Sequence, residues 1–253
     1  MTNILIWGIG GRLGRTVLDC LEKNNNAVAI GGVDKFANKE DFKLPIFASA
    51  SEINVQVDAI IDFSRPDAVY DILPYAKENN IPVVLCTTGY SALELDYIRE
   101  MSKYVAIFKA SNMSLGVNLL IDLVRKATNV LGENFDIELI EQHHNVKVDS
   151  PSGTALTIAN AINEEMNNTL EFKYGRHNSN ERREKKELGI HAVRGGTVVG
   201  KHEVLFLGND EIITIKHEAS SKAVFAEGAI KAAIYLTSVS EPGMYDMQDL
   251  LAK

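Results

Sequence analysis

The stretch that decides the fold is Gly8-Ile9-Gly10-Gly11-Arg12-Leu13-Gly14. An apolar run at 3–7 precedes it and a helix-forming run at 15–23 follows it, so the glycines lie in a strand-to-helix turn. In such a turn one glycine allows the tight bend, a second lets the backbone approach a pyrophosphate, and a third lets helix and strand pack closely. The stretch therefore predicts a dinucleotide-binding unit at the start of the chain.

The next apolar run, 27–33, ends at Asp34, which lies 20 residues after Gly14. That separation is expected for a carboxylate that binds the adenosine ribose. Asp34 favours NADH, because a 2′-phosphate would face its negative charge. Lys35 and Arg12 favour NADPH, because they can neutralise that phosphate. We expect NADH and NADPH both to bind, with a slight preference for NADH.

Further apolar runs at 57–63, 81–85 and 104–109 alternate with helix patterns, the first opened by Ser64 as a cap. This alternation predicts an α/β fold with a Rossmann-type doubly wound parallel sheet. Small and polar residues follow two of the strands, at the edge where the ligand crevice of such sheets lies. They are Cys86, Thr87, Thr88 and Ala110, Ser111, Asn112, Met113. Cys86 could be a nucleophile, but no cysteine-enzyme motif surrounds it, so a small strand-end residue is the better interpretation.

The chain changes character after a long helix that starts at Asn112 or Ser114 and stops at Gly132. A strand at 135–140 and three strand-like runs at 190–194, 202–207 and 212–217 predict a second α+β domain with an open mixed sheet. Short glycine-containing turns predict that the last three are antiparallel neighbours. One face should pack on two helices and the other should be covered by another subunit.

Helix patterns at 222–238 and within 241–253 should return to the first domain. The domains are therefore predicted as 1–113, completed by 222–253, for the dinucleotide, and 114–221 for substrate binding and oligomerisation. The polar segment 167–188 is either a lid or plain surface, and plain surface is favoured.

One segment of the second domain carries the residues suited to chemistry. It reads Glu141-Gln142-His143-His144-Asn145-Val146-Lys147-Val148-Asp149-Ser150-Pro151-Ser152-Gly153-Thr154-Ala155. Neighbouring strand residues face opposite ways, which argues against a two-histidine metal clamp. The N–H groups and hydroxyls of 152–154, at a helix start, would receive a carboxylate or phosphate, and Lys147 offers a charge or a proton. An anion site beside an acid/base pair suits the reduction of a small carboxylated substrate.

Composition limits the other function classes. The net charge of −8 disfavours nucleic-acid binding, and two cysteines in 253 residues favour a cytoplasmic chain without disulfides. Met1 leads straight into a strand and no apolar run is long enough to span a bilayer, so we expect neither signal peptide nor membrane contact. The other histidines show no ligand spacing, so no metal is expected.

These motifs together resemble the dihydrodipicolinate reductase (4-hydroxy-tetrahydrodipicolinate reductase) family over the whole chain. The glycine turn, Thr87-Thr88-Gly89, the run from Ala110 to Gly116 and above all the run from His143 to Ala155 match in order. The resemblance implies NAD(P)H-dependent reduction of the cyclic dicarboxylate 4-hydroxy-tetrahydrodipicolinate to tetrahydrodipicolinate, with loss of water, in diaminopimelate and lysine biosynthesis. It also implies a homotetramer. Ser150 stands where alanine is common, a change expected to be silent.

The resemblance also implies roles for single residues. His143 corresponds to the catalytic histidine and Lys147 to the proton donor, while His144, Lys147, Ser152, Gly153 and Thr154 correspond to the substrate site. The residues corresponding to the cofactor site are Gly8, Ile9, Gly10, Gly11, Arg12, Leu13, Asp34, Lys35, Cys86, Thr87, Thr88, Ala110, Ser111, Asn112 and Met113.

Two alternatives share the first half of the chain. A dehydrogenase of a sugar or aldehyde would need the same glycine turn, so only the run from His143 discriminates against it. A non-catalytic dinucleotide sensor would not need His143, Lys147 and the Ser152-Gly153-Thr154 turn, and all are present.

Overall fold

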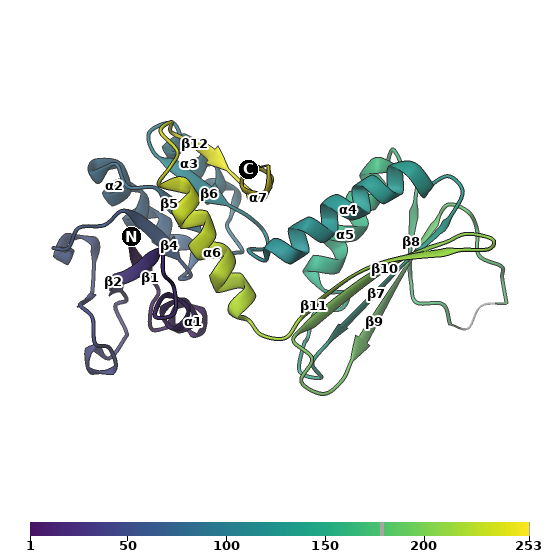
Figure 1. Cartoon of the computed structure of the whole chain (residues 1–253), viewed down its shortest axis with the longest axis horizontal. Coiled ribbons are helices and arrows are strands. Elements are labelled where there is room, and N and C mark those ends of the chain that lie inside the picture. Colours follow the sequence, from purple (N-terminus) through teal and green to yellow (C-terminus); the bar gives the residue numbers. More distant parts are fainter. Residues whose placement is uncertain (178–179, 253) are drawn as a thin grey trace. The chain divides into compact units, whose positions relative to one another are not determined.

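The computed structural model describes residues 1–177 and 180–252. The chain divides into two compact units. Unit 1 comprises Met1–Leu115 and Lys222–Lys253, and unit 2 comprises Gly116–Ser221 (Figure 1). The chain thus leaves unit 1 once, completes unit 2, and returns for its last segment.

Unit 1 contains a seven-stranded sheet in the order β12-β6-β5-β4-β1-β2-β3, in which all neighbouring strands are parallel. Its strands are β1 Thr2–Trp7, β2 Ala27–Val33, β3 Ile46–Phe47, β4 Ala59–Asp62, β5 Val83–Leu85, β6 Ala106–Lys109 and β12 Gly243–Tyr245. The order reverses between β1 and β4, which makes the carboxyl end of β1 the switch point of a doubly wound sheet. The predicted fold class is confirmed.

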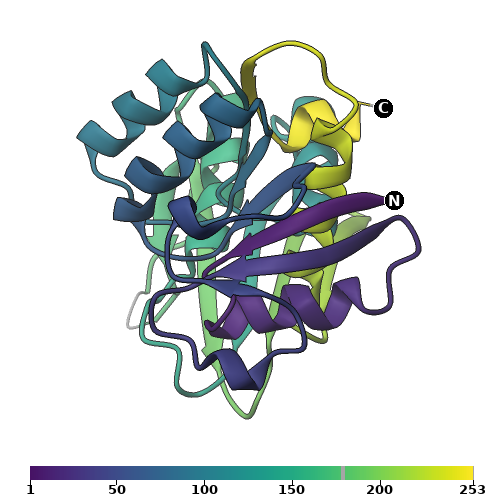
Figure 2. The same cartoon turned by 90° about the vertical axis from the view of Figure 1, so that its left-hand side faces the viewer.

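Helices cover both faces of this sheet because its strands are apolar on both sides. They are α1 Arg12–Leu21, α2 Val69–Asn79, α3 Ala92–Met101, α6 Ala223–Leu236 and α7 Met247–Leu251, with short 3₁₀ turns at Lys39–Asp41, Ala50–Glu52 and Pro66–Ala68. One apolar cluster joins α1, α6 and α7 to the side of β1 that carries Ile4 and Ile6. Figure 2 draws α1 in purple and α6 and α7 in yellow. A second cluster joins α2 and α3 to the other side, which carries Leu5. The last segment of the chain is thus part of the core of unit 1.

Unit 2 contains a five-stranded mixed sheet in the order β11-β10-β7-β9-β8. Its strands are β7 Asp136–His143, β8 Glu171–Tyr174, β9 Glu187–Arg194, β10 Gly200–Leu207 and β11 Ile212–Ala219. The helices α4 Leu115–Leu131 and α5 Gly153–Glu165 pack on one face through a cluster that includes Val124, Ile158, Leu139 and Phe206. Alternate residues of β7 are buried, so the two-helix cover predicted for one face is present.

The predicted order of the three last strands of this sheet is wrong in one place. β10 and β11 are antiparallel neighbours as predicted, but β9 and β10 are not paired with each other. β7 lies between them, parallel to β9 and antiparallel to β10. The short connection from β9 to β10 therefore crosses the end of β7. Because β7 lies between these two strands, the end of β9 lies beside the end of β7.

Three strands and one cap were also misjudged from the sequence. The polar segment 167–188 contains the edge strand β8, the tail contains the edge strand β12, and the loop after β2 contains the two-residue strand β3. Each of these strands is too short to show an apolar alternation. Ser64 does not cap the following helix. Its N–H and hydroxyl both donate to the carboxylate of Asp62, and the 3₁₀ turn starts after Arg65 without a side-chain cap.

Candidate active site

The glycine turn of unit 1 has the geometry that its sequence predicts. Gly8 has φ of +78°, and its carbonyl accepts the N–H of Gly11 at 3.0 Å. A Cβ on Gly14 would lie 2.2 Å from the carbonyl oxygen of Gly8, so α1 packs on the turn with no room for a side chain. The N-cap of α1 is Gly11, which provides no side-chain hydrogen bond. The start of α1 therefore keeps backbone N–H groups for an anion such as a pyrophosphate.

Asp34 at the end of β2 joins two loops of the same site. Its Oδ2 accepts the N–H of Gly10 at 2.9 Å, and its Oδ1 accepts the N–H groups of Phe36 at 2.9 Å and Ala37 at 3.2 Å. An ionised carboxylate offers about four lone-pair positions, so room for one further donor is left. The side chain thus holds the glycine turn against the loop after β2, a role that the sequence did not predict.

A cavity of about 340 Å³ lies beside these groups at the carboxyl ends of β1 and β2. Its lining includes Trp7, Gly11, Asp34, Lys35, Phe36 and Arg65. Lys35 and Phe36 are exposed. The cavity, the tight glycine turn and the uncapped α1 together fit the adenosine and pyrophosphate parts of a dinucleotide.

The other predicted cofactor residues follow β5 and β6 at the same edge of the sheet. Three of the fifteen have side chains in the apolar core of unit 1 rather than at its surface, namely Ile9, Cys86 and Met113. α6 packs closely on the segment that follows β6, since a Cβ on Gly228 would lie 1.7 Å from the carbonyl oxygen of Met113. Only the backbone of these residues is suited to contact a cofactor. Burial raises the pKa of the Cys86 thiol well above its ordinary value, which agrees with the choice of a small strand-end residue over a nucleophile.

Sequence reasoning missed Asp62, the last residue of β4 at this edge. Its side chain is fully buried, and it accepts the N–H of Ser64 at 2.9 Å as well as the Ser64 hydroxyl. Burial raises the pKa of Asp62 above its ordinary value, and the hydroxyls of Ser64, Thr87 and Tyr90 oppose that rise. The signal available in the sequence was an acid at the end of an otherwise apolar strand.

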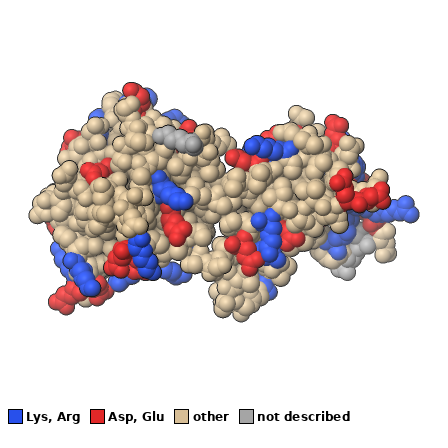
Figure 3. All heavy atoms as spheres, viewed as in Figure 1, with Lys and Arg blue, Asp and Glu red and all other residues tan. Residues whose placement is uncertain are grey.

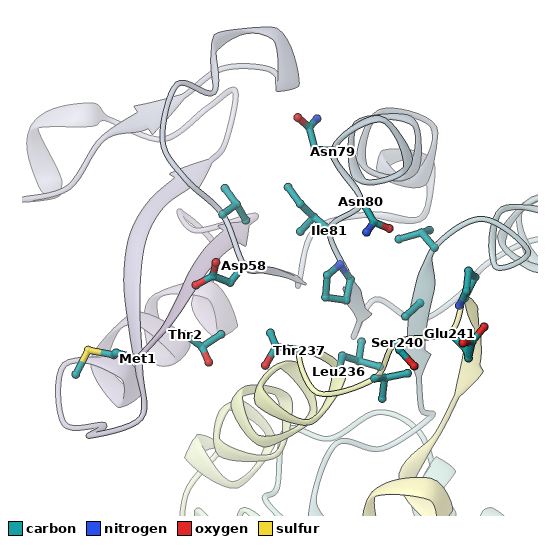
Figure 4. Close-up of a pocket in the computed structure, with 16 residues that line it drawn as sticks. Met1, Thr2, Asp58, Asn79, Asn80, Ile81, Leu236, Thr237, Ser240 and Glu241 are labelled. Carbon is teal, nitrogen blue, oxygen red and sulfur yellow. The ribbon is translucent and has the colours of Figure 1, made fainter.

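A second cavity lies elsewhere in unit 1. It measures about 470 Å³ and is lined by Thr2, Asp58, Pro82 and residues between Leu236 and Pro242 (Figure 4). Strands β1, β4, β5 and β6 begin there, so it lies at the amino ends of the strands, opposite the glycine turn. It is therefore distinct from the cavity that fits a dinucleotide.

In unit 2, β7 ends at His143 and α5 begins at Gly153. Several buried polar residues lie between these two ends, on the face of the sheet that the helices cover. Glu141 is fully buried and His143 is 8% exposed. The register places Glu141 between His202 of β10 and Ala192 of β9, and places Arg194 beside His143. This row of polar side chains continues the apolar row formed by Ile137 and Leu139.

Glu141 is the centre of this group, and sequence reasoning missed it. Its Oε1 accepts from the guanidinium of Arg194 at 2.7 Å and from the N–H of Ser152 at 3.0 Å. Its Oε2 accepts from Arg194 at 2.8 Å and lies 2.6 Å from Nδ1 of His143. Burial raises the pKa of Glu141, but the hydrogen bonds from Arg194, His143 and Ser152 outweigh it and hold that pKa below its ordinary value. The carboxylate is therefore ionised at neutral pH.

The predicted acid/base pair lies in one neighbourhood. Burial lowers the pKa of His143 below its ordinary value against the opposing effect of Glu141, and the charge of Lys147 adds to the lowering. Nζ of Lys147 lies 2.7 and 2.8 Å from the two carboxylate oxygens of Asp149. The lysine bond and the N–H of Gly153 contribute to holding the pKa of Asp149 below its ordinary value. The exposed carboxylate of Asp149 thus engages two of the predicted anion-binding groups, Lys147 and the N–H of Gly153.

The predicted anion-binding turn is only partly open. Ser152 is buried; its hydroxyl accepts the N–H of Ala155 at 3.1 Å as the N-cap of α5 and lies 3.1 Å from Nε2 of His202. Gly153 differs, because a Cβ there would meet nothing within 4 Å. His144 and Thr154 are half-buried. The open start of α5 is therefore at Gly153, while Ser152 holds the turn in place.

The described residues show no cluster suited to a metal ion and no helix suited to a membrane span. Among residues 1–177 and 180–252, no three histidines, cysteines or acids are grouped so as to hold a metal ion. Within the same residues, no helix has the length and apolar character needed to cross a bilayer. On the face shown in Figure 3, basic and acidic side chains alternate and form no continuous basic patch.

Comparison with known proteins decides the family. Residues 2–113 match the family model for the N-terminus of dihydrodipicolinate reductase, and residues 116–251 match the model for its C-terminus. A protein of Clostridium novyi (strain NT) named 4-hydroxy-tetrahydrodipicolinate reductase is 46% identical over 99% of this chain and 98% of its own length. The chain belongs to the dihydrodipicolinate reductase family. The resemblance drawn from the motifs is confirmed.

Other members and more distant proteins support the family fold. A 4-hydroxy-tetrahydrodipicolinate reductase of Caldanaerobacter subterraneus is 46% identical over 100% of this chain and 99% of its own length. The dipicolinate-bound dihydrodipicolinate reductase of Paenisporosarcina sp. TG-14 has the same fold, with a TM-score of 0.80, 22% identity and 97% of each chain covered. A myo-inositol dehydrogenase of Corynebacterium glutamicum also shares the fold, with a TM-score of 0.59, 14% identity, and 100% and 93% covered.

Proposed function

We propose that this member of the dihydrodipicolinate reductase family reduces 4-hydroxy-tetrahydrodipicolinate to tetrahydrodipicolinate with NADH or NADPH, in diaminopimelate and lysine biosynthesis. The overall reaction consumes one hydride and one proton and releases one water. The observation that carries the proposal is the group formed by His143, Lys147 and the open start of α5 at Gly153, in a chain that matches the family from end to end.

The substrate is a ring with two carboxylates, and the groups in unit 2 suit it. Lys147 and the N–H of Gly153, both now directed at Asp149, are cationic or positively polarised groups of the kind that bind a carboxylate. The name of the Paenisporosarcina reductase records bound dipicolinate, a dicarboxylate of the same shape class. A substrate carboxylate would replace Asp149 as the partner of these groups, with His144 and Thr154 beside it.

The proton donor belongs to unit 2, whereas the hydride donor is a cofactor that binds to unit 1. A reduced nicotinamide supplies the hydride when it is bound to the glycine turn and the strand ends of unit 1. Lys147 donates the proton to the ring as the hydride arrives, and His143, neutral at pH 7, accepts or returns a proton through its second ring nitrogen. Holding these groups in position accounts for several kcal/mol of the barrier, on the order of a proximity effect.

NADH is proposed as the preferred cofactor, with NADPH accepted. The carboxylate of Asp34 lines the cavity that fits the adenosine and repels a 2′-phosphate, while the exposed Lys35 on the same cavity attracts it. We also propose that the working form is a cytoplasmic homotetramer. Two free cysteines support a reducing compartment. The face of the unit 2 sheet that α4 and α5 leave uncovered supports an interface between copies.

A dehydrogenase of a polyol such as inositol is the alternative, because the fold alone is shared with such an enzyme. The test is a coupled assay in which the upstream synthase makes the substrate in place from pyruvate and aspartate semialdehyde. We expect rapid oxidation of NADH that depends on the synthase, and no reduction of NAD when myo-inositol is the substrate. Binding of NADH without synthase-dependent oxidation would contradict the proposal and favour a dinucleotide sensor.

A further inference from the structure

We propose that Glu141 is a positioning residue that fixes one tautomer of His143, with the proton on Nδ1 and the lone pair on Nε2. The inference rests on the proposed function for its effect on turnover, but the tautomer itself is a property of the protein without substrate. Neither Glu141 nor its partner Arg194 was among the residues that the motifs predicted.

Glu141 is stable as a charged carboxylate. A fully buried carboxylate without partners would be strongly destabilised in its charged form and would take up a proton. Here the guanidinium of Arg194 contacts both oxygens, at 2.7 and 2.8 Å, which is the paired geometry that best offsets burial. The ionised form is therefore the stable one, and an ionised carboxylate can only accept hydrogen bonds.

The charge of Glu141 determines which atom of its hydrogen bond with His143 carries the proton. Because Glu141 only accepts, Nδ1 of His143, 2.6 Å away, must be the donor. Burial keeps the pKa of His143 below its ordinary value, so the ring is neutral and carries one proton. That proton is on Nδ1, and Nε2 is left with its lone pair. Nε2 faces Gly200, where a Cβ would lie only 3.1 Å away, so the glycine makes room for this side of the ring.

The ion pair of Glu141 and Arg194 also holds the turn that follows His143. Glu141 also accepts the N–H of Ser152, and Arg194 donates to the carbonyl of Asp149 at 2.8 Å. The pair thus connects the ends of β7 and β9 with the turn that carries Lys147 and Gly153. One buried ion pair sets both the ring of His143 and the turn beside it.

The same strand provides a matched control on its other face. Glu138 lies 2.8 Å from Nε2 of His191 and accepts from Arg183 at 3.0 Å, so it is a second glutamate with a histidine and an arginine. Side chains of Glu138 and Glu141 lie on opposite faces of β7, because they are an odd number of residues apart. Glu138→Gln makes the same chemical change away from the predicted site.

The test is nitrogen NMR of histidine-labelled protein at pH 7 without ligands, with His143 assigned by the loss of its signals in His143→Gln. We expect a protonated Nδ1 and a bare Nε2 in the native chain and in Glu138→Gln. Glu141→Gln leaves Arg194 without its anion and is expected to unfold in part, so Glu141→Gln/Arg194→Gln removes both charges together. In that double variant we expect a mixture of tautomers.

Turnover is the second measurement. In the double variant kcat should fall on the order of a hundredfold, the scale of losing a positioned acid/base group, while the Kd for NADH stays unchanged. Glu138→Gln should keep the native kcat. A native His143 with its proton on Nε2, or a folded double variant with native kcat, would overturn the proposal. If the native protein fails the coupled assay, the proposed function is wrong while the tautomer remains testable by NMR.

Discussion

Nζ of Lys147 lies 2.7 and 2.8 Å from the two carboxylate oxygens of Asp149. The two residues are next but one in sequence, and the lysine side chain is 20% exposed while that of Asp149 is 59% exposed. The lysine that the motif predicts as proton donor is thus held by an acid at the surface of the same turn. A surface pair of this kind contributes little to stability, so it can open when a substrate carboxylate arrives.

Replacement of Lys147 tests its role directly. Lys147→Ala should lower kcat by about a hundredfold or more, because the proton donor is gone, while the Kd for NADH stays close to native. Val148→Ala is a suitable control, because Val148 is 97% exposed on the same turn. The measurements are the coupled assay and NADH fluorescence titration. Native turnover of Lys147→Ala would remove this residue from the mechanism.

Gly200 tests the space around Nε2 of His143. In Gly200→Ala the new Cβ would lie 3.1 Å from Nε2 and must displace the ring by a few tenths of an ångström. We expect kcat to fall about tenfold with the fold intact, because catalysis is sensitive to small misplacements. Gly195 lies in the connection that leads to Gly200, and a Cβ there would meet nothing within 4 Å, so Gly195→Ala should behave as native. Equal kcat for the two variants would show that the position of the ring does not matter.

Lys35 tests the cofactor preference. It lines the adenosine cavity and is exposed, so its charge can reach a 2′-phosphate but is not needed for a ribose hydroxyl. Lys35→Ala should raise KM for NADPH about tenfold and change KM for NADH by less than about twofold, as expected for the loss of one phosphate contact. Lys43→Ala, exposed outside that lining, is the control. A parallel rise for both cofactors would point to a structural role.

His202 makes the stability of unit 2 depend on pH. Burial lowers the pKa of His202 to about 4, with the charges of His143, His217 and Lys147 adding to the effect and Glu141 opposing it. Between the ordinary histidine pKa and that value the unfolded chain binds a proton that the folded chain does not. The free energy of unfolding should therefore fall as pH falls, by up to about 1.4 kcal/mol per pH unit.

Urea unfolding at pH 7, 6 and 5 measures this slope. His202→Gln removes one of the histidines with a lowered pKa and should make the slope smaller, whereas His177→Gln changes an exposed histidine and serves as the control. If the slopes of the native chain and His202→Gln agree, the proton uptake occurs at other residues.

The parts of the fold that could be predicted from sequence are those encoded locally. The glycine turn before Gly14, the strand that ends at Asp34 and the helix that starts near Ser152 each show their signal within a short window. The edge strands β8 and β12 could not be predicted, because strands of four and three residues are too short to show an apolar alternation.

The candidate site shows the same division. His143, Lys147 and Gly153 lie within one motif and were predicted together. Glu141 and Arg194 are 53 residues apart, and they meet only because β9 pairs with β7 rather than with β10. That register is a property of the whole sheet. Ser152 was assigned to the ligand, but its N–H and hydroxyl are engaged by Glu141 and His202.

Transfer of deuterium from reduced cofactor to product tests the reductase assignment most directly. The chain would be supplied with NADH deuterated at the reactive carbon, in each of its two stereochemical forms, and with substrate from the upstream synthase, and the product would be analysed by mass spectrometry. We expect one form to deliver one deuterium to a product that has lost the hydroxyl group as water. Oxidation of NADH with no deuterium in the product, or a product that keeps the hydroxyl, would contradict the assignment.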